Sequence, residues 1–600
     1  MNSSLTKIED AYKKGLLSTE ALENLKIWLT RPEFDKFVPE IDKLIQEEKW
    51  VELEDGFYAH IAIGTGGIRG PIGVGPNRMN TRAIGEAAQG LSQFIQDFGE
   101  DTIQKGVVVG HEVRKFSREF AVLCCEVFAG NGIKSYLFES IRSTPELSFS
   151  VRHLSTSAGV QITASHNPRT DNGFKFYWSD GGQVVAPLDL KFMELVTGVK
   201  EIKRMPYEEA LKNGMIQIVG KEIDESYFKE IQKLSLVNSR SAEIVFSPIH
   251  GAGSTNVLPI LKRQGFTVTV VPEQEQPDEN FPTAHGDLIN PEYREVMDLP
   301  IKFGEKLAAD VVICSDPDAD RIGVAAKRRS GDNELQFLTG NEVGVAMIHF
   351  ILSQMRLQGT IPKNGVVIST YVTTSLIADI ARSFGVKAVD DLLVGFKFIG
   401  ELIEKLDDKN DFIFAAEESL GYLSGTFVRD KDSAIASLVV AEMVSLLKDN
   451  SKTLVDYLNE IYIENGYYKN ILNMVELKGK KGQEHIKAIM MGLRGNPPEE
   501  LGGMKILSII DRLDEESRVP EKYKVGKTGD QLTFVLSENG KVRITARPSG
   551  TEPKIKYYIQ HHQSVKNDLE EVKSRIDTQS KKMEEEIVKH GEKFIKIEPT

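Results

Sequence analysis

The chain has 600 residues, of which 40% are hydrophobic and 27% charged. This composition is ordinary for a soluble globular protein, and at about 150 residues per domain the length predicts roughly four domains. Its 74 basic and 88 acidic residues give a net charge of −14, which argues against general attraction to nucleic acid or an anionic membrane. Three cysteines, Cys124, Cys125 and Cys314, offer no disulfide framework, and the first residues lack the apolar core of a signal peptide. We therefore expect a cytoplasmic protein with no nucleic-acid or membrane partner.

The predicted elements begin with amphipathic helices over the first fifty residues, where Leu22, Leu25 and Trp28 recur at helical spacing. After a glycine-rich stretch at 64–75, short β-rich runs alternate with helix-length segments. The runs lie at 106–110, 135–139, 159–165, 243–248, 267–273, 310–316, 365–370 and 412–418. This alternation predicts parallel α/β units, some of which could be distant copies of one another.

From Tyr467 onward the pattern changes to scattered strands and long helices, and the charged stretch at 564–593 is predicted to be a helix with a solvated face. Polar segments at 200–224, 327–334 and 455–466 are candidate domain boundaries.

The sharpest motif is TASHNP, from Thr163 to Pro168, at the carboxyl end of the predicted strand at 159–165. A tight loop at the carboxyl end of a strand is where open α/β folds bind ligands, so the Ser165 hydroxyl could be a nucleophile or a phosphate carrier. The alternative is a turn in which this serine satisfies backbone groups before the proline.

A second motif, DPDADR, begins at the last residue of the predicted strand at 310–316 and holds Asp316, Asp318 and Asp320 at alternate positions. Three crowded carboxylates need a cation, and a hard metal such as Mg²⁺ suits oxygen ligands. A calcium EF-hand is excluded because Arg321 stands where that loop needs glycine and Lys327 where it needs glutamate. An acidic surface turn is the remaining alternative.

Glu417 and Ser419 lie at the end of the predicted strand at 412–418 and could accept hydrogen bonds from sugar hydroxyls. The alternative is a helix start with acids in its first turn.

A loop from Arg547 to Pro553 (RPSGTEP) combines an arginine, two hydroxyls and a glycine, which suits a phosphate cradle. The alternative is a plain turn between two strands. Two weaker segments, GTGGIR at 64–69 and GHEVRKFS at 110–117, place arginines beside glycine or short turns. Neither matches a Walker loop or a dinucleotide-binding fingerprint.

Taken in order, GTGGIR, GHEVRKFS, TASHNP, DPDADR, VGFKFIG, EESLGY with RDKD, and RPSGTEPK resemble the α-D-phosphohexomutase superfamily, most closely its long-type bacterial phosphoglucomutase/phosphomannomutase branch. The resemblance implies three related α/β domains and a smaller α+β C-terminal domain around a central cleft. The expected domains are 1–210 with the phosphoserine loop, 211–330 with the metal loop, 331–460 with the sugar loop, and 461–600 with the phosphate loop.

The resemblance also implies residue roles. Ser165 would carry the phosphoryl group and bind Mg²⁺ with the three aspartates, and Arg69, Lys175 and Arg321 would be catalytic. The substrate-binding set would be His166, Lys397, Glu417, Ser419, Lys431, Arg547, Ser549, Gly550 and Thr551. One departure is Val394, where many glucose-specific relatives carry threonine.

The implied activity is a phosphoglucomutase, an isomerase working by intramolecular phosphotransfer, that converts glucose 1-phosphate to glucose 6-phosphate, and also mannose phosphates, with glucose 1,6-bisphosphate as activator and intermediate. The alternatives are a phosphopentomutase, a glucose 1,6-bisphosphate synthase, or a silent sugar-phosphate-binding protein. A monomer or a homodimer is expected.

Overall fold

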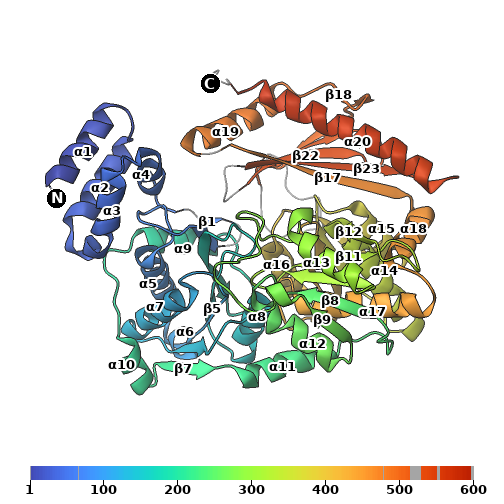
Figure 1. Ribbon diagram of the computed structural model, residues 1–600, viewed down its shortest axis with the longest axis horizontal. Coiled ribbons are helices and arrows are strands. Elements are labelled where there is room, and N and C mark those ends of the chain that lie inside the picture. The colour runs from blue at the N-terminus through green and yellow to red at the C-terminus, as the bar shows by residue number, and fades with distance from the viewer. Residues whose placement is uncertain are drawn as a thin grey trace. The chain divides into compact units, whose positions relative to one another are not determined.

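The structure is a computed structural model that describes residues 2–61, 63–64, 67–477, 479–513, 529–549 and 554–595 (Figure 1). Its contacts divide the chain into two compact units. The first comprises Met1–Ser143, Ser150–Ile223 and Asp278–Ile289, and the second comprises Thr144–Phe149, Asp224–Pro277 and Asn290–Thr600.

The first unit begins with a small helical bundle, as the sequence predicts. It consists of α1 (Asn2–Lys13), α2 (Thr19–Thr30), the 3₁₀ helix η1 (Pro32–Phe37), α3 (Val38–Gln46) and α4 (Trp50–Phe57). Trp28 is the centre of its core and stacks on Phe34 with ring centroids 4.5 Å apart, while Phe57 meets the same indole edge-on. The periodic apolar residues therefore close a hydrophobic core of their own.

The remainder of the first unit is a seven-stranded sheet in the order β1-β2-β6-β5-β3-β4-β7. Its strands are β1 (Ile63–Gly64), β2 (Gly67–Pro71), β3 (Val107–His111), β4 (Ser135–Phe138), β5 (Ala158–Ile162), β6 (Asp171–Trp178) and β7 (Ile216–Val219). Its helices are α5 (Thr81–Asp97), α6 (Glu100–Lys105), α7 (Ser117–Gly130), α9 (Leu188–Thr197) and α10 (Tyr207–Lys212). The residues of α8 (Thr144–His153) and of α11 (Lys221–Gln232) are divided between the two units.

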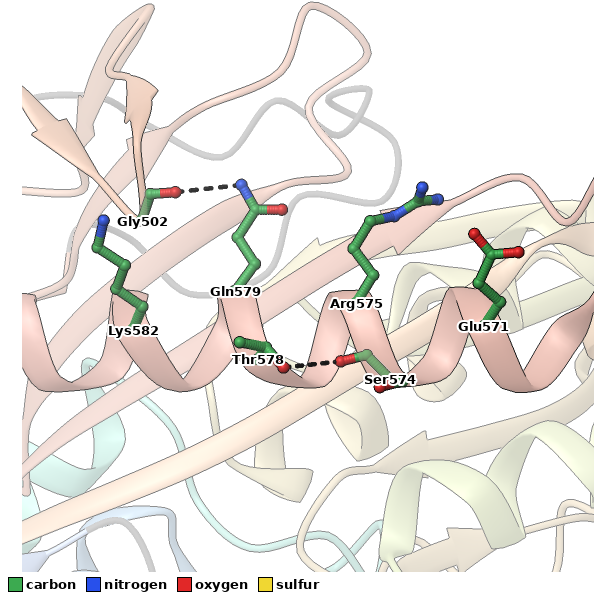
Figure 2. Close-up of a pocket in the computed structure, with 7 residues that line it drawn as sticks. All are labelled: Gly502, Glu571, Ser574, Arg575, Thr578, Gln579 and Lys582. Carbon is green, nitrogen blue, oxygen red and sulfur yellow. Dashed lines mark hydrogen bonds between the residues drawn. The ribbon is translucent and has the colours of Figure 1, made fainter.

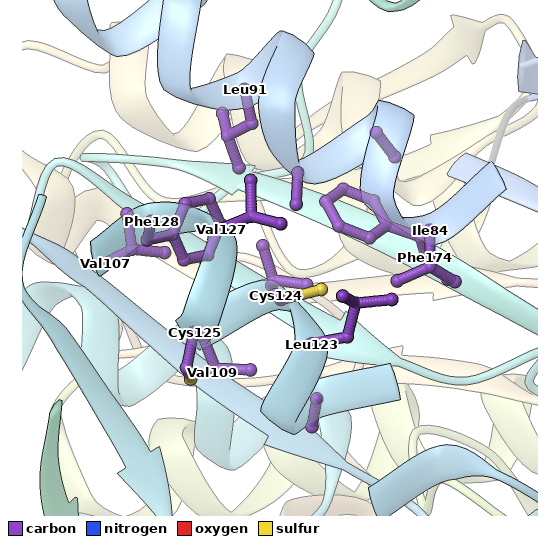
Figure 3. Close-up of a cluster of buried hydrophobic side chains, with 14 of the residues drawn as sticks. Ile84, Leu91, Val107, Val109, Leu123, Cys124, Cys125, Val127, Phe128 and Phe174 are labelled. Atoms are coloured by element: carbon purple, nitrogen blue, oxygen red, sulfur yellow. The ribbon is translucent and has the colours of Figure 1, made fainter. Parts of the chain in front are cut away.

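Figure 3 shows the core where α5 and α7 meet this sheet. Ile84 and Leu91 from α5 lie close to Cys124 and Phe128 from α7, over Val109 of β3. Cys124 and Cys125 are fully buried free thiols in this core.

The second unit holds two further α/β sheets. The first has β8 (Glu243–Ser247), β9 (Thr267–Val270), β10 (Val311–Ser315), β11 (Ile322–Lys327) and β12 (Leu335–Leu338), with η2 (Ala252–Ser254), α12 (Val257–Arg263), η3 (Pro272–Gln274) and α13 (Arg294–Lys306). The next has β13 (Val366–Thr370), β14 (Lys387–Leu392), β15 (Phe412–Glu417) and β16 (Gly421–Leu423), with α14 (Gly340–Gln358), α15 (Ser375–Ser383), α16 (Phe396–Lys405), η4 (Lys409–Asp411), α17 (Ser433–Asp449) and α18 (Leu454–Asn465).

The three α/β sheets repeat one arrangement of four strands: β6-β5-β3-β4, β11-β10-β8-β9 and β16-β15-β13-β14. In each, the last three strands are parallel and the first runs antiparallel to its neighbour. The prediction of parallel units is thus confirmed for three strands per sheet, and the antiparallel fourth strand was not foreseen. It creates a hairpin at the carboxyl end of β5, β10 and β15, and each hairpin carries one of the predicted motifs.

The C-terminal part of the second unit is an antiparallel sheet in the order β17-β23-β22-β21-β20. Its elements are β17 (Tyr467–Glu476), α19 (Gly479–Gly495), the hairpin β18 (Glu500–Leu501) and β19 (Met504–Lys505), β20 (Ser508–Asp511), β21 (Leu532–Val535), β22 (Arg543–Pro548), β23 (Lys554–Gln563) and α20 (Leu569–Glu592). Figure 1 shows α19 and α20 covering one face of this sheet.

The predicted helix at 564–593 forms as α20, but it is not simply a solvated helix. Leu569, Ile576, Met583 and Ile587 recur at helical spacing and are buried against the sheet. The many charged residues occupy the remaining positions, which is why the sequence reads as polar overall.

The predicted domain boundaries stay predictions, although β7 at Ile216–Val219 pairs with β4 and so extends the first sheet beyond residue 210. Among the helices within the described ranges, none combines the length and the apolar composition that crossing a membrane requires.

Candidate active site

Ser165 lies in the hairpin between β5, which ends at Ile162, and β6, which begins at Asp171. It is 2% exposed, and its φ of +54° places it in the left-handed region that few residues other than glycine adopt. Such a conformation persists only where the surroundings hold it, and it is concentrated at functional sites.

The threonine two residues earlier fixes the amino side of this serine. The Ser165 backbone N–H donates to Thr163 Oγ1 at 2.7 Å, and Thr163 Oγ1 donates to Glu112 Oε1 at 2.9 Å. The hydroxyl that satisfies this backbone group is therefore that of Thr163. Ser165 Oγ lies 3.2 Å from Nδ1 of His166, which places an imidazole beside the hydroxyl.

Lys175 and Arg69 lie on neighbouring strands of the same sheet. Lys175 is buried in β6, and Arg69 in β2 pairs with Gly173 of β6. A Cβ at Gly173 would stand 2.4 Å from the carbonyl oxygen of Thr163 and 2.9 Å from Cβ of Arg69. Only glycine therefore allows β2, β6 and the serine hairpin to approach this closely.

The aspartate motif forms the hairpin between β10 and β11, which is the corresponding position in the second sheet. Asp316, Asp318 and Asp320 are completely buried, and their ligand atoms all lie within 4.8 Å of one another. The acidic surface turn is therefore excluded. Ala319, at the tip, has a φ of +52°, and a Cβ at Gly251 would meet the backbone of Pro317 at 2.5 Å.

Each end of this cluster has an identified protein partner. Asp316 Oδ1 accepts hydrogen bonds from the backbone N–H groups of Asp320 (3.0 Å) and Arg321 (2.9 Å). Asp318 Oδ2 accepts from Thr144 Oγ1 at 2.7 Å. These hydrogen bonds orient the Asp316 and Asp318 carboxylates within the hairpin.

Burial and crowding raise the proton affinity of Asp316. Burial, and then the neighbouring Asp320 and Asp318, raise the pKa of Asp316 well above its ordinary value. A buried set of carboxylate oxygens with this much mutual repulsion is the donor set that a hard divalent cation requires. The residues present therefore fit a metal ion.

Two side-chain cations accompany the aspartates. Arg321 Nε lies 3.5 Å from Asp320 Oδ1, and Lys431 Nζ lies 3.1 Å from Asp320 Oδ2 and 3.1 Å from Asp430 Oδ1. Arg321 also donates to the carbonyl oxygen of Ser419 at 2.8 Å, which ties the hairpin of the aspartates to the hairpin between β15 and β16. Lys431, predicted as a substrate contact, is thus placed beside the metal loop.

The EES motif forms the third hairpin, between β15 and β16, so the alternative of a helix start is wrong. Leu420 at its turn has a φ of +67°, and the backbone N–H of Ile322 in β11 donates to its carbonyl oxygen at 3.2 Å. Glu417 is 4% exposed and accepts from the backbone N–H of Gly395 at 2.9 Å. Lys397 follows two residues later, in the first turn of α16.

The two glutamates of this hairpin are perturbed. Burial raises the pKa of Glu417, while Lys431 and Arg321 lower it. Burial, and then the adjacent Glu417, raise the pKa of Glu418 to about 7. Glu418 accepts from Thr373 Oγ1 at 3.3 Å. The sugar loop therefore contains one acceptor compensated by cations and a second that is partly protonated near neutral pH.

The predicted phosphate cradle joins β22 to β23, and these strands pair with Arg547 opposite Lys556. The Ser549 N–H donates to the carbonyl oxygen of Lys554 at 2.7 Å, which closes the hairpin. Gly550 and Thr551 lie outside the described residues.

The second unit contains a cavity of about 260 Å³, lined by residues of the hairpin between β15 and β16, of α14 and of the C-terminal sheet, among them Glu418, Asn341, Asn470 and Gln560. An open surface hollow of about 610 Å³ lies between Gly502 and α20 (Figure 2). The hollow is lined by Gly502, Glu571, Ser574, Arg575, Thr578, Gln579 and Lys582, none of which belongs to a predicted motif.

Two residues that hold the site carry no sequence signal for that contact. Thr144 is separated from Asp318 by 174 residues. Glu112 lies in the weak GHEVRKFS segment, and nothing in that segment indicates its contact with Thr163. These partners are found only when distant segments are brought together.

Three family models cover most of the chain. Residues 60–202, 225–331 and 339–464 match the models described as phosphoglucomutase/phosphomannomutase, alpha/beta/alpha domains I, II and III. These three domains in order, followed by a strand-rich C-terminal part, define the class of the α-D-phosphohexomutase superfamily.

Proteins of similar sequence indicate which family within this superfamily the chain belongs to. A phosphoglucomutase of Staphylococcus haemolyticus (strain JCSC1435) is 34% identical over 518 residues, which cover 84% of this chain and 91% of the relative. A phosphoglucomutase of Staphylococcus aureus (strain N315) is 34% identical over 554 residues, which cover 91% and 96%. The chain belongs to the phosphoglucomutase/phosphomannomutase family.

Solved structures share the fold at lower identity. Parafusin, an exocytosis-sensitive phosphoprotein and phosphoglucomutase from Paramecium, aligns with a TM-score of 0.64 at 20% identity, covering 90% of this chain and 97% of its own. A phosphoglucomutase/phosphomannomutase family protein from Burkholderia thailandensis aligns with a TM-score of 0.59 at 15% identity, covering 88% and 97%.

Proposed function

We propose that this chain is a Mg²⁺-dependent phosphoglucomutase that interconverts glucose 1-phosphate and glucose 6-phosphate through a phosphoserine at Ser165. The observation that carries the proposal is the backbone of Ser165, left-handed and buried at the tip of a hairpin that follows a central strand. The names of the staphylococcal relatives support the same activity.

In the first half-reaction, the bond between phosphorus and Ser165 Oγ breaks while phosphorus bonds to the free hydroxyl oxygen of the sugar phosphate. The hydroxyl gives up a proton to a base, and one proton returns to Ser165 Oγ, so charge and atoms balance. Glucose 1,6-bisphosphate is the product of this step. After it reorients, its other phosphate returns to Ser165 by the reverse exchange. His166 Nδ1, 3.2 Å from Ser165 Oγ, is positioned to hold the returning proton.

Mg²⁺ held by Asp316, Asp318 and Asp320 would supply positive charge to the oxygens of the transferring phosphoryl group. The chain itself contributes Arg321, whose guanidinium is anchored on Ser419 and lies beside Asp320. Lys175 and Arg69, on strands that flank the serine hairpin, are proposed to stabilise charge or move the substrate proton.

Glu417 and Ser419 are proposed to accept hydrogen bonds from sugar hydroxyls, with Lys397 nearby on α16. Arg547 and Ser549, together with Gly550 and Thr551, are proposed to bind the phosphate that is not reacting. Lys431 is proposed to act near the substrate through its position beside Asp320.

We base the proposed sugar preference on Val394, which is not one of the catalytic or substrate-binding residues named above. Val394 lies in the turn that leads to Gly395, whose N–H contacts Glu417. A valine there offers no hydroxyl to the sugar, so we propose that glucose is not the only substrate and that mannose phosphates are also converted. Relative kcat/KM values for glucose, mannose and ribose 1-phosphates test this, and a preference for ribose 1-phosphate would favour a phosphopentomutase.

A coupled assay that follows glucose 6-phosphate formation from glucose 1-phosphate, with and without glucose 1,6-bisphosphate and Mg²⁺, tests the activity. We expect turnover that depends on both. Binding of glucose 1-phosphate without turnover would instead identify a silent sugar-phosphate-binding protein. Net accumulation of glucose 1,6-bisphosphate from a phosphoryl donor would identify a synthase.

We propose that the enzyme works in the cytoplasm, because its three cysteines are buried free thiols, which suit a reducing compartment. Light scattering of the purified protein distinguishes a monomer from a homodimer.

A further inference from the structure

Arg114 lies in the GHEVRKFS segment and contacts the backbone of the serine hairpin four times. Its Nη2 donates to the carbonyl oxygens of Ser165 at 2.5 Å and Asn167 at 2.7 Å. Its Nη1 donates to the carbonyl oxygens of Pro168 at 2.7 Å and Asp171 at 2.9 Å. One guanidinium thus gathers four carbonyl groups from the segment 165–171.

The fifth N–H of this guanidinium completes a network around Ser165. Arg114 Nε donates to Glu112 Oε1 at 2.5 Å, and both side chains are fully buried. The same Glu112 oxygen accepts from Thr163 Oγ1, which in turn accepts from the Ser165 N–H. The amino side of Ser165 is therefore fixed through Thr163 and its carbonyl side directly by Arg114.

An arginine has five N–H donors, and all five are engaged here. Arg114 is also 1% exposed, so it has neither a donor nor a surface to offer a substrate phosphate. Its role must be exerted through the loop that it holds.

We propose that Arg114 is a positioning residue that holds Ser165 in its left-handed conformation and thereby aims Ser165 Oγ for phosphoryl transfer. The inference rests on the proposed role of Ser165 as the phosphoryl carrier. A non-glycine residue keeps a positive φ only where its neighbours over-determine it, and the four carbonyl contacts supply that constraint. A phosphoryl group transfers in line, so a small misplacement of the carrier oxygen slows the reaction.

The planar guanidinium group of Arg114, with its five N–H donors, is essential to this role. A lysine at position 114 keeps the positive charge but has a single nitrogen, which cannot reach four carbonyl oxygens and a carboxylate in a planar arrangement. Arg114→Lys therefore separates the geometry of the contact from its charge.

Arg240→Lys is the matched control. Arg240 donates to the carbonyl oxygens of Val237, Ser239 and Gln264 and to the buried carboxylate of Glu442, and it contacts no residue of the serine hairpin. Both substitutions remove a guanidinium fork from backbone carbonyls, so a general loss of stability should lower Tm in both variants.

The experiment compares wild type, Arg114→Lys and Arg240→Lys in three measurements. Intact-mass analysis follows phosphorylation of the dephosphorylated protein by glucose 1,6-bisphosphate, steady-state assays give kcat and KM, and hydrogen exchange reports on the peptide covering 163–171. For Arg114→Lys we expect the phosphorylation rate and kcat to fall by roughly 10- to 100-fold, the scale of a misplaced reacting group, with KM changed far less. Exchange in the 163–171 peptide should become faster in this variant alone.

A phosphorylation rate and hairpin exchange in Arg114→Lys equal to those of Arg240→Lys would overturn the inference. If wild type itself is never phosphorylated, the proposed function fails. The exchange measurement still tests whether Arg114 holds the backbone of the serine hairpin. If Arg114→Lys does not fold, Glu112→Gln tests the inference instead. This variant keeps Arg114 but weakens the contact between its Nε and the side chain of residue 112. Glu112→Gln should show the same changes at smaller size, and wild-type rates and exchange in it would likewise overturn the inference.

Discussion

The serine hairpin and the metal hairpin occupy corresponding places in their own sheets but are held by opposite means. Both follow a central parallel strand, and both have a non-glycine residue at positive φ, Ser165 and Ala319. In the first, a buried cation, Arg114, gathers backbone carbonyl oxygens. In the second, three buried anions face one another, and burial and repulsion raise the pKa of Asp316.

The difference shows which groups stabilise the conformation of each hairpin. The serine hairpin is complete within the protein, because every donor of Arg114 has an acceptor. The metal hairpin carries an excess of negative charge that a divalent cation would compensate. The ion dependence of the protein should therefore reside in the second hairpin, and the covalent chemistry in the first.

Removing the hydroxyl of the serine hairpin should have the largest effect. We expect Ser165→Ala to lower turnover by a factor on the order of 10⁴ or more, the scale for loss of a nucleophile. The protein should stay folded. Ser157→Ala is the control, since Ser157 is equally buried but its Oγ donates to the carbonyl oxygen of Thr102. Substantial turnover in Ser165→Ala would remove the phosphoserine from the reaction.

Removing one carboxylate from the metal hairpin should weaken metal binding while stabilising the metal-free protein. Asp318→Asn should lower Mg²⁺ affinity by more than the roughly 10- to 100-fold that loss of an outer partner costs. It should also raise Tm without metal, because it relieves repulsion among buried carboxylates. Calorimetric titration and thermal unfolding with and without Mg²⁺ measure both.

Asp310→Asn is the matched control for this test. Asp310 lies at the other end of β10 and pairs with Lys327 and Lys448 at 2.8 Å each. Its loss should lower Tm and leave metal affinity unchanged. Equal behaviour of Asp310→Asn and Asp318→Asn would contradict a metal site at the hairpin.

Each hairpin has one threonine whose hydroxyl supports it, which allows a balanced test. Thr144→Val removes the donor to Asp318 and should lower metal affinity by roughly 10-fold, with phosphorylation of the metal-saturated protein little changed. Thr163→Val removes two hydrogen bonds beside Ser165 and should slow phosphorylation at unchanged metal affinity. If both variants change the same quantity, the two hairpins do not have separate roles.

The smallest effect concerns pH and the third hairpin, which Arg321 ties to the metal hairpin. Burial and Glu417 raise the pKa of Glu418 from 4.5 to about 7, so between these values the native state binds more protons than the unfolded state. The free energy of unfolding should therefore fall as pH rises through this window, by an amount on the order of a few kcal/mol that is complete above pH 7.

Glu418→Gln removes this titration. Its stability relative to wild type should grow as pH rises from about 4.5 to 7 and then level off. Urea unfolding across the window measures the difference, and a difference independent of pH would show that Glu418 ionises normally.

Much of the fold and the site could be predicted from the sequence. Apolar runs bounded by polar turns predicted β3, β4, β5, β8, β9, β10, β13 and β15, because strand alternation is local. Ser165 and the three aspartates were identifiable because each motif directly follows such a run. The hairpins that carry them were not predicted, since antiparallel return of β6, β11 and β16 depends on which strands pair. The predicted helix at 564–593 forms as α20 and has a solvated face, whereas the packing of its other, apolar face against the sheet was not predicted.

By itself, the sequence determined the order of the elements and the chemical character of each loop, because both follow from residues that are neighbours along the chain. The tertiary structure alone decided which groups hold those loops. Thr144 reaches Asp318 across 174 residues, and Arg114 reaches carbonyl groups more than fifty residues away. Backbone carbonyls are present in every residue, so only the folded chain can select the four that one arginine binds.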